Sequence, residues 1–155
     1  MLFRSLPITI GIAAFASLTR RDCRFLTIKG FSESWADGAR RLASVEPAGY
    51  TRIGTALRHA TSVLGKAPAR RRLLLLVSDG KPTDYDRYEG RYGVADVRQA
   101  VREAHQRSVH LFALAVDAEA RAYLPQMFGK GNYAILPRPD ALAGALARVV
   151  AAVMR

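Results

Sequence analysis

The feature of this sequence that most constrains the fold is an uninterrupted apolar run from Leu73 to Val77, preceded by three arginines and followed by Ser78-Asp79-Gly80. The run is too short for a buried helix of ordinary length and offers no polar side to water. It is typical of a strand buried on both faces, as in a parallel sheet covered by helices. We therefore expect Leu73–Val77 to be a central strand.

Helices and strands alternate after this run. Apolar residues recur at helical spacing from Val94 to Ala104, and Val109–Val116 forms a second apolar strand, which completes a strand–helix–strand unit. We expect a short helix over Ala118–Met127, a strand over Tyr133–Leu136 and a last helix over Leu142–Val153. This alternation predicts a doubly wound, Rossmann-like α/β fold.

The pattern of the preceding part of the chain predicts a hairpin followed by two helices. Ile8–Ala16 and Arg24–Lys29 are expected strands, and the polar stretch Thr19–Asp22 is the expected turn between them. Helical patterns run over Ser34–Val45 and Ile53–Leu64. No linker or internal repeat divides the sequence, so a single domain over residues 1–155 is expected.

Composition supports a globular domain in a reducing compartment. Half of the 155 residues are hydrophobic, which is enough for one core. Packing between helices and sheet is the expected role of four aromatic residues, Phe31, Trp35, Phe112 and Phe128. The single cysteine, Cys23, excludes an internal disulfide, and we expect a cytoplasmic location.

The amino-terminal segment has some features of a secretion signal. Arg4 precedes an apolar stretch that ends in Ala14-Phe15-Ala16, which has the small-x-small pattern of a cleavage site. Alternating isoleucines in this stretch favour a strand instead.

The net charge of +11 raises affinity for phosphate-rich or acidic partners. A basic nucleic-acid-binding protein is therefore one alternative, although no recognition motif accompanies the charge. A hydrolytic or phosphoryl-transfer enzyme that uses Asp79 or Asp117 is another, since doubly wound sheets host many enzymes. The sequence offers no nucleophile paired with a base, so we expect no enzyme activity.

Asp79 and Asp117 each follow an apolar strand. The carboxyl ends of parallel strands meet at one edge of a sheet, where ligands of this fold class bind. Each carboxylate could hold a cation or merely cap a helix or turn, and the residues alone leave both roles open.

Three stretches carry a family resemblance: Ser78 to Gly93, Tyr50 to Ala60, and Arg121 to Gly129. Together they resemble the von Willebrand factor type A domain, most closely the carboxyl-terminal domains of NorD- and CbbO-type activation proteins. The resemblance covers about residues 8–155. It implies a non-enzymatic protein-interaction module that works with a client enzyme, nitric oxide reductase or Rubisco, and a MoxR-type AAA+ ATPase.

The resemblance also implies part of a metal-ion-dependent adhesion site. In that family, Mg²⁺ is held by an Asp-x-Ser-x-Ser motif after the first strand, a threonine in a second loop and an aspartate after a later strand. Thr51 matches the threonine and Asp79 the later aspartate. The Asp-x-Ser-x-Ser motif does not occur in these 155 residues, so we expect weak or absent Mg²⁺ binding.

By the same resemblance, the family's first strand and first helix are missing. That strand is central, and the strands at Ile8–Ala16 and Leu73–Val77 would flank it. Three explanations follow, the most favoured first: a true start further upstream, a non-functional gene fragment, and direct pairing of these two strands in a smaller sheet. Unpaired apolar edges promote aggregation, so the isolated chain is expected to be marginally stable or prone to aggregate.

The loop after Leu73–Val77 combines charges with tyrosines. EF-hand spacing is not followed there, so a calcium loop is excluded. We predict a partner-binding surface formed by Lys81, Asp84, Asp86, Tyr88, Glu89 and Arg91. A solvated loop whose tyrosines pack locally is the open alternative.

Overall fold

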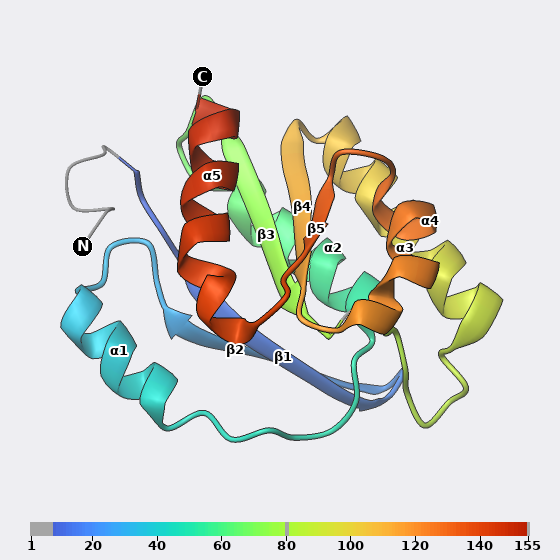
Figure 1. The fold of residues 1–155 in the computed structure, drawn as a ribbon. Coiled ribbons are helices and arrows are strands. Elements are labelled where there is room, and N and C mark those ends of the chain that lie inside the picture. Colours follow the sequence, from blue (N-terminus) through green and yellow to red (C-terminus); the bar gives the residue numbers. More distant parts are fainter. Residues whose placement is uncertain (1–7, 80, 155) are drawn as a thin grey trace.

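The computed structural model describes residues 8–79 and 81–154 as two sheets with helices around them (Figure 1). In the first sheet, β1 (Ile12–Thr19) pairs antiparallel with β2 (Asp22–Lys29). The second sheet is parallel and has the order β3 (Arg72–Ser78), β4 (Val109–Ala115) and β5 (Tyr133–Ile135). The predicted hairpin and the predicted strand–helix–strand units are confirmed.

Helices cover both faces of the parallel sheet, so the doubly wound architecture is also confirmed. In Figure 1, α5 lies in front of the sheet, whereas α2, α3 and α4 lie behind it. The α-helices are α1 (Trp35–Ala43), α2 (Ile53–Gly65), α3 (Gly90–Gln106), α4 (Leu124–Phe128) and α5 (Leu142–Met154). Two 3₁₀ turns, η1 (Ala118–Ala122) and η2 (Pro139–Ala141), complete the described elements. No helix in the described ranges is both long and apolar enough to cross a membrane.

The main hydrophobic core lies between the parallel sheet and the helices behind it. Leu76 and Leu111 of the sheet pack there with Val97 of α3, Leu57 of α2 and Met127 of α4. On the front face, Leu114 and a few neighbours pack with α5 in a smaller cluster. Because strand side chains alternate between faces, consecutive leucines of β3 serve both clusters, as the unbroken apolar run predicts.

Several element boundaries differ from expectation. The first strand lies later than Ile8–Ala16, because pairing with β2 is organised around a turn at Arg20 and Arg21. The helix predicted over Ala118–Met127 is divided at Tyr123 into η1 and α4. Trp35 is 45% exposed, so its assignment to the core was wrong.

The explanation that the first strand pairs directly with Leu73–Val77 is also wrong. In the described ranges β1 pairs with β2, and β3 pairs with β4, so the two sheets stay separate. They are joined by α2, which packs against strands of both, and by Phe15 of β1, which contacts the main core.

Two isolated bridges join the loops at the carboxyl ends of the strands. Ser17 pairs with Tyr50, and Thr51 pairs with Thr83 in the loop after β3. Backbone bonds of 3.0 and 3.2 Å connect Thr51 and Thr83 in both directions. The segment before α2 therefore forms a bridge from the hairpin to the loop after β3.

A buried ion pair fixes this bridge. Arg52 Nε donates to Asp84 Oδ2 at 3.0 Å, and both side chains are almost fully buried. The Arg52 backbone N–H donates to Ser17 Oγ at 3.1 Å, and its guanidinium lies 4.4 Å from the centre of the Tyr88 ring. One residue thus holds together the hairpin, the start of α2 and the loop after β3.

The surroundings of Asp84 favour its ionised form. Burial by itself would raise the pKa of the Asp84 carboxyl, but the hydrogen bond from the Asp86 N–H and the bond and charge of Arg52 outweigh it and hold the pKa below its usual value. A buried carboxylate of this kind is stable only while its cation and its hydrogen-bond donors stay in place.

A second buried contact connects the same loop to α2 and α3. The Tyr88 hydroxyl donates to Asp96 Oδ2 at 2.5 Å and accepts from the Gly54 N–H at 3.0 Å. Burial, reinforced by Asp96, raises the Tyr88 pKa well above its usual value. A side chain at position 54 would collide with the Asp96 carboxylate, so this close approach requires glycine.

We predict that Asp84→Asn destabilises the fold by about 3–5 kcal/mol, because it leaves the Arg52 charge buried without its partner. Asp86→Asn is the matched control, since Asp86 is 34% exposed and lies 3.7 Å from Arg52, and it should cost at most about 1 kcal/mol. Urea unfolding of the three proteins at pH 7 measures both values. Equal effects of the two substitutions would contradict the assignment.

The same pair predicts a pH dependence. The folded-state pKa of Asp84 lies below the unfolded value of about 3.9, so its contribution is complete above the unfolded value and disappears as the pH falls through the folded one. The stability difference between wild type and Asp84→Asn should therefore be constant near neutral pH and shrink in acid. A difference that grows in acid would have the wrong sign for this mechanism.

Candidate functional site

The carboxyl ends of β1, β3 and β4 meet at one side of the molecule, at the lower right of Figure 1. The Tyr85 N–H donates to the Leu18 carbonyl, which joins the loop after β3 to the end of β1. The Val116 N–H donates to the Ser78 carbonyl, which joins the ends of β4 and β3. We call this region the carboxyl edge.

Thr51 and Asp79 both bond to the backbone of Lys81 at the carboxyl edge. The Thr51 hydroxyl donates to the Lys81 carbonyl at 3.0 Å. The Lys81 N–H in turn donates to Asp79 Oδ1 at 3.4 Å. The Asp79 side chain is exposed and that of Thr51 is half-buried, and both offer an oxygen of the kind that a hard cation prefers.

Asp117 has the capping role that the sequence left open. Its Oδ1 accepts from the Glu119 N–H at 2.9 Å at the start of η1. The negative charge of Asp117 also affects Tyr123. Burial raises the pKa of the Tyr123 hydroxyl, and the charges of Asp117, Asp79 and Glu119 raise this pKa further.

Acidic, histidine and cysteine side chains do not cluster around a possible metal position in the described part of the chain. No group of three or more of these side chains in the described ranges is placed to hold a metal ion. A dedicated Mg²⁺ or Ca²⁺ site needs several oxygen ligands, and the resemblance predicted two, Thr51 and Asp79.

The structure divides the predicted partner-binding residues into two groups. Lys81, Asp86, Glu89 and Arg91 are exposed, as contact residues must be. The prediction that Asp84 and Tyr88 contact a partner directly does not fit the structure, because Asp84 is 6% exposed and Tyr88 is fully buried. These two residues support the loop from within, which the alternation of charged and aromatic residues did not reveal.

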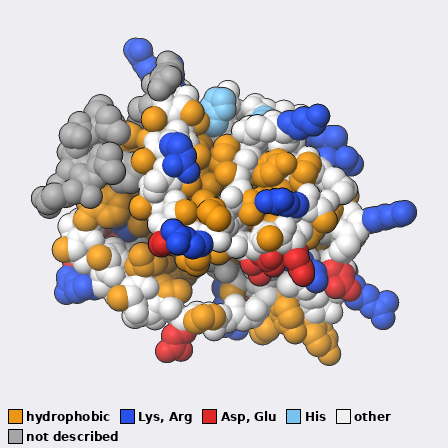
Figure 2. All heavy atoms as spheres, in the orientation of Figure 1, with side chains coloured by type: hydrophobic (Ala, Val, Ile, Leu, Met, Phe, Trp, Pro, Cys, Tyr) orange, Lys and Arg blue, Asp and Glu red, His pale blue; other side chains and the backbone are white. Residues whose placement is uncertain are grey.

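Further contact candidates lie outside the six predicted contact residues. Tyr85 is 77% exposed and Tyr92 60%, and Leu18, Tyr50, Val77 and Val116 are partly exposed at the same edge. Figure 2 shows hydrophobic, acidic and basic side chains intermixed at the lower right of the molecule. Exposed tyrosines next to arginine are typical of protein–protein contact surfaces. The tyrosines were the available signal, but the sequence did not show which of them point outward.

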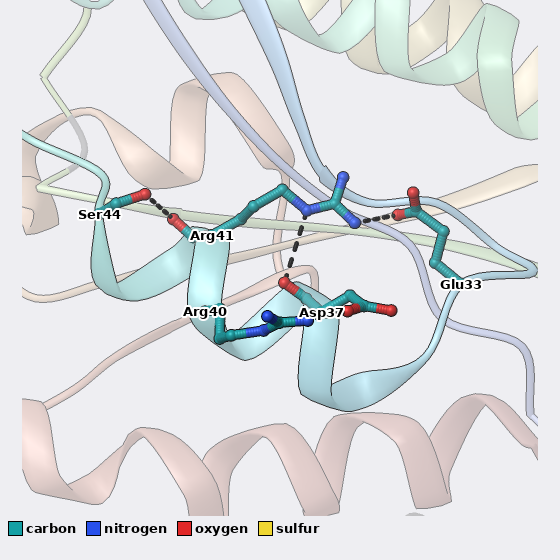
Figure 3. Close-up of a pocket in the computed structure, with 5 residues that line it drawn as sticks. All are labelled: Glu33, Asp37, Arg40, Arg41 and Ser44. Carbon is teal, nitrogen blue, oxygen red and sulfur yellow. Dashed lines mark hydrogen bonds and ion pairs between the residues drawn. The ribbon is translucent and has the colours of Figure 1, made fainter.

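A depression on α1, away from the carboxyl edge, has no free charge to offer a ligand (Figure 3). Arg41 Nη2 lies 2.8 Å from Glu33 Oε2, and Arg40 pairs with Asp37. The Ser44 hydroxyl donates to the Arg41 carbonyl. These groups neutralise one another on the surface of the helix, so we assign no site there.

Sequence comparison finds the von Willebrand factor type A domain over residues 4–142. Protein NorD of Stutzerimonas stutzeri is 46% identical over 131 residues, which cover 84% of this chain and 21% of that protein. Protein NorD of Brucella abortus (strain 2308) is 47% identical over 127 residues, which cover 81% of this chain and 20% of that protein. The chain thus spans about a fifth of the length of these curated relatives.

Solved structures with the same fold are more distant in sequence. The conserved hypothetical protein BatB of Bacteroides thetaiotaomicron aligns with a TM-score of 0.65 at 15% identity, over 94% of this chain and 79% of that one. The manganese-loaded TRAP protein of Plasmodium vivax aligns with a TM-score of 0.63 at 15% identity, over 88% and 55%. At this identity the likeness shows the fold alone.

The family match extends over residues 4–142, which is most of the chain, and both solved structures share its fold. The chain therefore belongs to the von Willebrand factor type A domain family.

Proposed function

We propose that this chain is a non-enzymatic protein-interaction module of the NorD and CbbO type. In this proposal, it binds a client enzyme, nitric oxide reductase or Rubisco, and a MoxR-type AAA+ ATPase supplies the mechanical work. Support comes from the family match and from the NorD relatives, which are about 46% identical over most of the chain. A cytoplasmic location is part of the same proposal and rests on the cysteine usage of the sequence.

The observation that carries the proposal is the composition of the carboxyl edge. Exposed tyrosines, aliphatic residues and arginines lie around Asp79 on loops that buried contacts hold in place. Aromatic and arginine side chains are the residues that most often dominate binding energy in protein interfaces. A surface whose loops are fixed before binding also loses less conformational entropy when a partner docks.

For the metal, we propose that Thr51 and Asp79 are the ligands which the described part of the chain contributes, and that Mg²⁺ binding is weak or absent without further ligands. The two side chains fit a hard cation by chemistry, since a hydroxyl and a carboxylate are both oxygen donors. Bound there, a divalent cation would leave coordination positions open to a carboxylate of a partner protein. The structural neighbour TRAP holds manganese, so Mn²⁺ is a second ion to test.

We expect the chain to bind one of the two purified client enzymes, nitric oxide reductase or Rubisco, from the same organism, measured by biolayer interferometry. Tyr85→Ala should weaken binding by about tenfold or more, because it removes the most exposed aromatic side chain of the carboxyl edge. Arg91→Glu should weaken binding, whereas Arg102→Glu, further along the exposed side of α3, should not. Absence of binding at about 100 µM protein, or equal effects of the two arginine variants, would contradict the proposal.

Titration calorimetry with Mg²⁺ and with Mn²⁺ should give no measurable heat, or a Kd of about 1 mM or weaker. Asp79→Ala should leave this result unchanged and should not alter thermal stability, because Asp79 is an exposed loop residue. Micromolar binding that Asp79→Ala abolishes would show that the chain completes a metal site by itself and would overturn the proposal.

A further inference from the structure

We propose that the outer side of α3 binds an acidic α-helix of a partner protein through Arg91, Arg98 and Arg102, which we call the arginine stripe. Residues seven and four positions apart lie on one side of a helix, and these three extend over about 16 Å of α3. The proposal concerns a second partner segment and does not depend on client binding at the carboxyl edge. Because Arg91 also lies at the carboxyl edge, the experiments below change only Arg98 and Arg102.

The first observation is that α3 separates its charges onto two sides. Its two acidic residues, Asp96 and Glu103, both pair with Arg58 of α2, at 2.8 and 2.7 Å. The hydrogen bond from Arg58 holds the pKa of the Glu103 carboxyl below its usual value, so this group is charged and committed to α2. Asp96 also accepts from the buried Tyr88 hydroxyl. The outer side of α3 is left with its cations alone.

The second observation is that the arginine stripe has no counter-charge within the described part of the chain. All three residues are exposed, and none forms an ion pair with a described residue. By contrast, Arg52 and Arg58 each pair with neighbouring carboxylates. In Figure 2, basic side chains project from the right-hand side of the molecule, where α3 lies in Figure 1. The stripe therefore presents concentrated positive charge to a partner.

The third observation is that these positions oppose the stability of the helix itself. Arg98 and Arg102 are four positions apart, where like charges repel. Arg91 lies in the first turn of α3, which contains no acidic residue, although the positive end of the helix dipole there favours carboxylates. No contact of the described residues offsets either effect. Carboxylates of a partner would relieve both.

The spacing and the surroundings of the stripe favour a helix as the partner. Arginine binds a carboxylate through two parallel hydrogen bonds, and two helices packed side by side have the same rise per residue. Exposed Ala95 lies on the same side of α3, and its small side chain allows another helix to approach closely. Exposed Glu89 and half-buried Glu103 flank the stripe. These carboxylates would repel a continuous polyanion such as a nucleic acid or an anionic membrane, but they leave room for separate carboxylates on one helix.

The test uses the full chain and two fluorescent peptides of about twenty residues, a length at which alanine-rich helices form. Both carry four glutamates in an alanine–glutamine background. In the first peptide the glutamates stand at i, i+4, i+7 and i+11 and share one side, whereas in the control they are five positions apart and surround the helix. By fluorescence anisotropy at low salt, the first peptide should bind at least about tenfold more tightly. Equal binding of the two peptides would overturn the proposal.

Protein variants locate the contact on α3. The double variant Arg98→Gln with Arg102→Gln should weaken binding of the first peptide by about tenfold or more. The matched control is Arg20→Gln with Arg21→Gln, which removes the same charge from the exposed turn of the hairpin and should change binding by less than about twofold. Equal losses in the two double variants would show that net charge alone attracts the peptide and would contradict the proposal.

Two further measurements separate binding from a structural role. The variant Arg98→Gln with Arg102→Gln should melt at the wild-type temperature or slightly above it, because it removes a repulsion between like charges. A clear decrease would show that these arginines support the fold and would count against the stripe as a binding surface. In the wild-type chain, the first peptide should shift the Nε–Hε NMR signals of Arg98 and Arg102 and leave those of Arg20 and Arg21 in place. The reverse pattern would overturn the proposal.

A single-stranded oligonucleotide and anionic phospholipid vesicles distinguish the other sources of negative charge. Each is titrated against the wild-type chain and the variant Arg98→Gln with Arg102→Gln under the same salt conditions. Weaker binding than that of the first peptide supports the proposal. Tighter binding of either probe that the double variant abolishes would show that the stripe recognises phosphate groups, and the choice of an acidic helix would be wrong.

Discussion

The buried pair between Arg52 and Asp84 is the interaction on which the arrangement of the carboxyl edge depends. The hairpin and the parallel sheet share no strand pairing in the described part of the chain, so their relative position at this edge rests on loops. Arg52 contacts Ser17 of the hairpin and Asp84 of the loop after β3 while it begins α2. Burying two charges costs free energy, and removing one partner of a buried pair costs more. The pair therefore fixes the positions of the segments that it joins and adds little net stability.

The Arg52–Asp84 pair also determines where Thr51 lies relative to Asp79 and which tyrosines of the loop point outward. Thr51 directly precedes Arg52 and is bridged to Thr83. Movement of Arg52 would therefore also move the Thr51 hydroxyl, which bonds to Lys81 near Asp79. Tyr88 turns inward under the Arg52 guanidinium, and its neighbours Tyr85 and Tyr92 remain exposed. The same loop therefore supplies both the support and the contact surface.

The fold was largely predictable from the sequence, because apolar periodicity reports burial directly. The run Leu73–Val77 and the strand–helix–strand units follow from such local patterns. The separation of the two sheets could not be predicted in this way, because pairing between distant strands has no local signature in the sequence. Likewise, the inward direction of Asp84 and Tyr88 depends on Arg52 and Asp96, which are distant in sequence. Thr51 and Asp79 were predicted as metal ligands by family resemblance, and both bond to the backbone of Lys81 in the structure; their role as ligands stays a prediction.

The central claim, that one buried ion pair fixes the carboxyl edge, is tested most directly by native-state hydrogen exchange at Thr51 and Thr83. Their amides bond to each other's carbonyls and so report whether the two loops stay joined. Both amides should exchange slowly and at similar rates in the wild-type chain, and both should become fast together when Asp84 is replaced by asparagine. Fast or unequal exchange in the wild-type chain, or slow exchange that survives the substitution, would contradict the claim.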